Sequence, residues 1–116
     1  MGKNQLRADD VQGYLLAAHD ELRDTELRYG LTCYSRVILS QKRGTLKFVM
    51  VAVRRSETME EVEYARAERE WPSARYTSLH ALLYACAMSL NIAVQRAYFN
   101  ENGHFLGDAP AEARKG

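Results

Sequence analysis

Alternating apolar and polar residues in the middle of the chain predict two adjacent β-strands. The segments Leu31–Gln41 and Thr45–Arg55 are rich in Val, Ile, Tyr, Phe and Thr, which favour strands. A glycine between them, Gly44, favours a tight turn. With a two-residue loop ending at Gly44, Lys42 would pair with Thr45, and the residue numbers of every opposing pair would sum to 87.

The two faces of this predicted hairpin differ in character. The first is apolar and is expected to face the core; it would carry Leu39, Phe48, Val37, Met50, Ser35 and Ala52. The second mixes apolar and cationic side chains; it would carry Ser40, Lys47, Ile38, Val49, Arg36, Val51, Tyr34, Val53, Thr32 and Arg55. Because such a face suits bulk water poorly, we expect a partner subunit, a ligand or the C-terminal segment to cover it.

A helical period of apolar residues precedes the hairpin. Val11, Leu15, Ala18 and Leu22 share one face of a helix predicted to run from Ala8 to Tyr29, and Gly30 is suited to end it.

A second helix is predicted late in the chain, capped by Thr77 or Ser78. Its apolar stripe consists of Leu79, Leu82, Leu83, Cys86, Ala87 and Leu90. This helix could end near Asn91 or continue to Ala97. If it ends early, a short fourth strand from Ile92 to Phe99 is the alternative.

The segment Met59–Trp71 fits two structures. Its Glu, Ala and Arg content suits a helix, but residues 62–67 alternate as in a strand. We favour a third strand that places Ala65, Ala67 and Trp71 on one side and Val62, Tyr64 and Arg66 on the other.

These elements predict an α+β fold with the order α-β-β-β-α and a possible further strand. A three-stranded antiparallel meander, or a four-stranded one, would carry both helices on one face. We expect a single domain over residues 1–106 and a polar, disordered tail over residues 107–116. The element order matches that of the double-stranded-RNA-binding domain. That family's lysine cluster is absent from the start of the second helix, which offers only Arg75, so we do not assign the chain to it.

Composition excludes several classes of protein. The chain has 116 residues, 47% hydrophobic and 27% charged, which is typical of one globular domain. It contains no apolar run that could span a bilayer, no apolar signal segment and only two cysteines, so we expect a cytoplasmic protein without a membrane interaction. The glycines form no phosphate-binding motif and the cysteines no zinc-binding spacing, so we expect no cofactor, no metal and no catalytic residues.

The charged residues are unevenly distributed although the net charge is only +1. Residues 28–56 contain seven Lys and Arg and no acid, whereas residues 57–70 contain six glutamates. The basic segment could bind an anion, or the two segments could be adjacent strands whose charges neutralise each other.

Aromatic residues interleaved with cations suggest a binding function, because aromatic rings stack on bases while cations hold phosphates. Trp71 lies between Arg69 and Arg75, and Arg96 precedes Phe99 and Phe105. We therefore expect non-catalytic binding, or sequestering, of a nucleotide or single-stranded nucleic acid by a homo-oligomer. The expected ligand-binding residues are Arg36, Lys47, Arg55, Trp71, Arg75, Arg96, Phe99 and Phe105. The alternative is a small protein-interaction module, such as a phage-encoded inhibitor or adaptor.

Overall fold

The fold has the expected α+β character, with three antiparallel strands in one sheet and helices before and after them. A computed structural model describes residues 7–108. The elements, in chain order, are α1 (Ala8–Asp20), α2 (Arg23–Tyr29), β1 (Thr32–Ser40), β2 (Thr45–Arg55), β3 (Glu61–Trp71) and α3 (Leu79–Asn102). Most of the expected tail, residues 109–116, lies outside the described residues.

The sheet has the order β1-β2-β3, as in a meander, but the loop of its first hairpin is longer than expected. Ser40 pairs with Thr45 and Thr32 with Val53, so opposing residue numbers sum to 85 and four residues form the loop. The predicted sum of 87 was therefore wrong. Because the shift is two residues, every side chain keeps its predicted face. Gly44 in the loop has φ 67°, a conformation that favours glycine.

The third strand is present, and the helical alternative for residues 59–71 was wrong. A β-bulge between Ala52 and Val53 changes the pairing: Ala52 opposes Ala65, but Val53 opposes Glu63. Tyr64 is the extra residue. Because of it, Val62 pairs with Arg54, whose guanidinium contacts Glu101 of α3 at 3.0 Å, on the helix side. The prediction that Val62 and Tyr64 share a face with Arg66 was therefore wrong.

The single N-terminal helix expected over residues 8–29 is interrupted at Glu21 and Leu22. The amides of these residues bond three residues back, to Ala18 and His19, instead of four. Leu22 is fully buried, and Asn91 of α3 donates its side-chain amide to the Glu21 carbonyl. The break thus lies against α3, a contact that the local pattern around Glu21 does not reveal. Gly30 ends α2 at φ 65°, as expected.

The last helix, α3, ends at Asn102, beyond both of the C-terminal ends considered, Asn91 and Ala97. The prediction of a fourth strand at Ile92–Phe99 was therefore wrong. The Ser78 hydroxyl accepts a hydrogen bond from the Ala81 amide, which confirms the predicted cap. At about 1.5 Å per residue, α3 is about 36 Å long, which matches eleven strand residues at about 3.3 Å each. It covers β3 from Tyr64 onwards, whereas Glu61, Val62 and Glu63 at the start of the strand are exposed.

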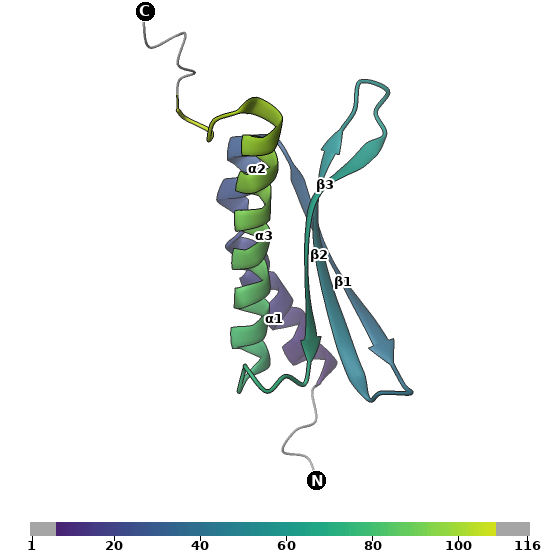
Figure 1. The fold of residues 1–116 in the computed structure, drawn as a ribbon. Coiled ribbons are helices and arrows are strands. Elements are labelled where there is room, and N and C mark those ends of the chain that lie inside the picture. The colour runs from purple at the N-terminus through teal and green to yellow at the C-terminus, as the bar shows by residue number, and fades with distance from the viewer. Residues whose placement is uncertain (1–6, 109–116) are drawn as a thin grey trace, which may run out of the picture.

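The core lies between the helices and one face of the sheet (Figure 1). The fully buried side chains of α3 are Leu82, Leu83, Cys86, Ala87, Leu90 and Val94. They meet Phe48, Met50 and Ala52 of β2 and the two buried alanines of β3. Helix α3 packs on β3 and β2, whereas β1 has only slight contact with α1. The far half of β1 therefore remains uncovered.

Two leucines five residues apart test this division between core and surface. We expect Leu22→Ala to lower the free energy of unfolding by about 2–5 kcal/mol, because Leu22 is completely buried. Leu27→Ala, at a position 84% exposed, should change it by less than about 0.5 kcal/mol. Urea denaturation of both variants measures these values, and equal effects would contradict the described interruption between α1 and α2.

Candidate functional site

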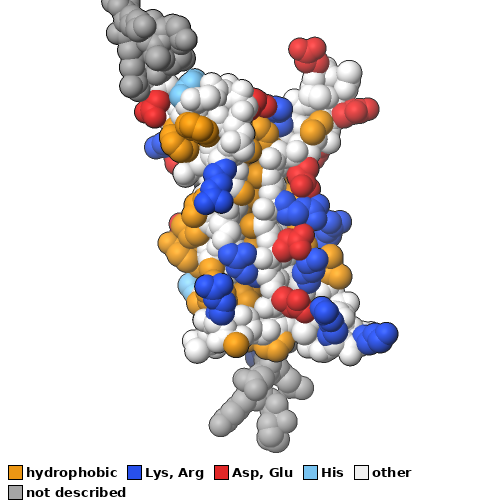
Figure 2. Space-filling view, viewed as in Figure 1, with side chains coloured by type: hydrophobic (Ala, Val, Ile, Leu, Met, Phe, Trp, Pro, Cys, Tyr) orange, Lys and Arg blue, Asp and Glu red, His pale blue; other side chains and the backbone are white. Residues whose placement is uncertain are grey.

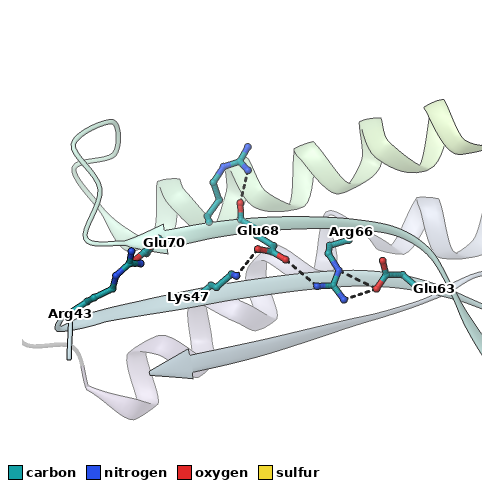
Figure 3. A network of polar contacts seen from close by, with 7 residues as sticks. Arg43, Lys47, Glu63, Arg66, Glu68 and Glu70 are labelled. Carbon is teal, nitrogen blue, oxygen red and sulfur yellow. Dashed lines mark hydrogen bonds and ion pairs between the residues drawn. The ribbon is translucent and has the colours of Figure 1, made fainter. Parts of the chain in front are cut away.

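The open face of the sheet, opposite the helices, carries a chain of ion pairs within β3 and between β2 and β3 (Figure 3). Lys47 Nζ lies 2.9 Å from Glu68, and Arg66 contacts both Glu68, at 3.1 Å, and Glu63, at 2.7 Å. Hydrogen bonds from Lys47 and Arg66 lower the pKa of the Glu68 carboxyl. The basic and acidic segments are thus adjacent strands whose charges largely neutralise each other.

The three cations expected to hold phosphate on this face differ in their partners. Lys47 is paired with Glu68, and Arg55 lies 3.9 Å from Glu61. No carboxylate among residues 7–108 lies within ion-pair distance of Arg36. Arg36 borders a recess of about 330 Å³ that Val49, Val51 and the ion-paired Glu63 and Arg66 also line. Of the three cations predicted to hold phosphate, only Arg36 therefore has no carboxylate partner among the described residues.

A second group of arginines follows α3. Arg69 of β3 donates hydrogen bonds to the Ser89 hydroxyl of α3 and to the Glu68 carbonyl oxygen, at 2.7 Å for the latter. Arg96 lies seven residues after Ser89, on the same side of the helix. Arg75 precedes the first turn of α3 and is exposed. Within the described part of the chain, none of these three arginines has a carboxylate partner.

We call Arg69, Arg75 and Arg96 the arginine row. Along α3 in Figure 2, Lys and Arg side chains follow one another without an Asp or Glu between them, whereas over the strands the two signs alternate. A shallow hollow of about 500 Å³ lies beside Arg96, lined by α3 residues that include Ser89 and Asn100. Three of the described cations that have no carboxylate partner therefore lie along this helix, whereas Arg7, Arg36 and Lys42, which also have none among residues 7–108, lie elsewhere.

Two exposed phenylalanines lie just beyond the arginine row. The rings of Phe99 and Phe105 are 4.7 Å apart between centroids, and these residues are 41% and 50% exposed. Phe99 is three residues after Arg96, so the two side chains are neighbours on the helix surface. Trp71, by contrast, is half-buried and packs against the core, so part of its ring is already occupied.

The eight predicted site residues therefore do not form one compact site. Arg36, Lys47 and Arg55 lie on the open face, and the other five lie at the helix layer. Sequence reasoning placed Arg69 only beside Trp71. The alternation of the predicted strand already places Arg69 on the side of Ala65, Ala67 and Trp71, away from the neighbouring glutamates, but only the packing of α3 shows that Ser89 lies there.

Side chains that bind metals do not cluster in the described residues. These residues contain no group of three His, Cys, Asp or Glu side chains that could hold a metal ion. His80 packs edge-on against Tyr14, and His19 contacts Glu26 at 3.2 Å. Over residues 7–108, no helix is both long and apolar enough to cross a membrane.

Comparisons with known proteins add no family to these observations. No family model, no curated protein and no solved structure gives a significant match to the chain.

The reactivity of the two free cysteines, Cys33 and Cys86, tests whether their thiols are buried. Burial raises the pKa of the Cys33 thiol to about 12 and that of Cys86 to about 11. Since the thiolate is the reactive form, both residues should be almost entirely unreactive near pH 8 in the folded protein. We expect a colorimetric thiol assay to detect them only after denaturant is added. Rapid reaction of either cysteine in the folded protein would contradict the burial of its thiol.

Proposed function

We propose that the protein binds single-stranded nucleic acid without catalysis, through the arginine row and the adjacent phenylalanine pair. The observation that carries this proposal is the absence of any carboxylate partner for Arg69, Arg75 and Arg96 within residues 7–108. Most other described cations are paired. A cation that no carboxylate compensates can neutralise a phosphate and release its counterions, even where, as for Arg69, neutral groups also accept its hydrogen bonds.

The spacing of the arginine row favours a chain of phosphates over a single nucleotide. Arg69 meets α3 at Ser89, about 10 Å along the helix from Arg96. Arg75 precedes Leu79, the first residue of α3, and Leu79 itself is about 15 Å along the helix from Ser89 in the other direction. One nucleotide could not reach all three guanidinium groups, whereas a strand lying along α3 could.

The exposed phenylalanines supply a stacking surface at one end of the arginine row. Phe99 and Phe105 present aromatic faces that can accept a base without regard to its identity. Such stacking is worth about 1–3 kcal/mol per base, so it would add substantially to three phosphate contacts. Arg36 and its recess could hold a further phosphate on the open face, while Lys47 and Arg55 would contribute less because each already contacts a glutamate.

The first test removes two charges from the arginine row. We expect Arg75→Gln with Arg96→Gln to weaken binding of a labelled oligothymidylate roughly tenfold or more. The slope of log K against log salt should become shallower by about 1.4, because each lost phosphate contact to a single strand accounts for about 0.7. Fluorescence anisotropy over a salt series measures both quantities.

The matched control removes the same charge elsewhere. Arg23→Gln with Arg28→Gln changes two exposed arginines that already pair with Asp20 and Asp24. Affinity and salt slope should stay close to those of the unmodified protein, so loss of binding in both double variants would assign it to net charge alone. Binding of ATP but not of the oligonucleotide would overturn the preference for a strand.

The alternative, a protein-interaction module, predicts a different result. In that case neither oligonucleotide nor ATP binds, and a stoichiometric protein partner is recovered from cell extract after nuclease treatment.

A further inference from the structure

Strand β1 is an edge of the sheet, and its outer side is only partly protected. The Cys33 amide donates to the Glu26 carboxylate of α2 at 2.8 Å, so this amide points away from β2. Strand residues alternate in the direction of their backbone polar groups. The N–H and C=O groups of Ser35, Val37 and Leu39 therefore also point outward, where no described strand pairs with them.

The protection of this edge ends after Cys33. Leu31 and Cys33 are 6% and 2% exposed, because the α2 segment covers them. Farther along, Val37, Ile38 and Leu39 are 38%, 43% and 61% exposed. Three consecutive apolar residues on both faces of an open edge strand are a strong template for pairing with another strand.

The opposite edge of the sheet lacks this character. β3 carries a bulge and a run of alternating charges, Glu68, Arg69 and Glu70, which are features that discourage strand addition. Within β1, by contrast, Arg36 is the one charged residue. One edge is thus guarded, and the other is open only over residues 35–39.

We propose that this open segment pairs antiparallel with the same segment of a second copy, about a two-fold axis at Val37. The axis lies at Val37 because Val37 is the centre of the uncovered segment, residues 35–39. Ser35 then opposes Leu39 of the second copy, and the outward N–H and C=O groups of the two strands bond to each other. The result is a continuous sheet with the order β3-β2-β1-β1-β2-β3.

Charge and side-chain contacts agree with this register. Arg36 lies opposite Ile38 of the second copy, so no like charges face each other directly. An axis one pair earlier, at Arg36, would place two arginines face to face. The chosen register also brings the two Val37 side chains together on the helix side of the sheet, where each is exposed in the single copy.

The oligomeric state of the full chain gives the first test. We expect light scattering during gel filtration to show a concentration-dependent dimer. Val37→Lys should make the protein monomeric with unchanged far-ultraviolet circular dichroism, because two charges would meet on the axis. Val62→Lys, at a position on β3 that is 49% exposed, should remain dimeric.

A crosslinking experiment tests the register even if Val37→Lys fails to fold. In Val37→Cys the two introduced residues would lie about 5.5 Å apart between Cα atoms. In Leu39→Cys they would be about 13 Å apart, although position 39 is the more exposed. A bifunctional thiol reagent too short for the longer distance should link the first variant faster, and the buried native cysteines should not interfere.

Three results would overturn the proposal. The first is a monomer at every concentration, and the second is a dimer in which Leu39→Cys is crosslinked as fast as Val37→Cys. The third is a monomer whose β1 edge pairs with a strand of a different protein.

Discussion

Helix α3 stabilises this fold by burying one apolar stripe against one face of the sheet. Its six fully buried side chains meet the central strand and the two small alanines of β3, which allow the helix to approach closely. The same helix contacts the interruption between α1 and α2 through Asn91. A 24-residue helix can cover only part of a three-stranded sheet, so the placement of α3 over β3 and β2 leaves β1 under-covered. The two surfaces with proposed roles, the arginine row and the open edge, both follow from this placement.

Much of the fold could be predicted from the chain because its signals are local. The apolar stripe from Leu79 to Leu90, the Ser78 cap and the Gly30 end each depend on neighbouring residues. The errors arose where tertiary packing decides. The break at Glu21 lies against Asn91, seventy residues away, and residues 92–99 continue a helix that packs on β3. Neither contact can be recognised from the neighbouring residues in the chain.

The candidate site was less predictable for the same reason. A basic segment followed by an acidic one predicts either an anion-binding surface or neutralisation, and only the pairing of β2 with β3 distinguishes them for Lys47 and Arg55. Arg96, Phe99 and Phe105 formed a recognisable cluster because they are close in sequence. Arg69 joins them only through Ser89, across a strand and a helix, so no spacing in the chain could have revealed it.

The extra residue at Tyr64 has a consequence for reading substitutions in β3. Before it, even-numbered positions such as Val62 share the helix side with Arg54; after it, odd-numbered positions such as Ala65 and Ala67 do. A mutational scan of this strand should accordingly show its pattern of tolerance reverse parity at that point. In a homologous chain that lacked this one inserted residue, the side chains before position 64 would lie on the opposite faces of the sheet, although the two sequences would align well.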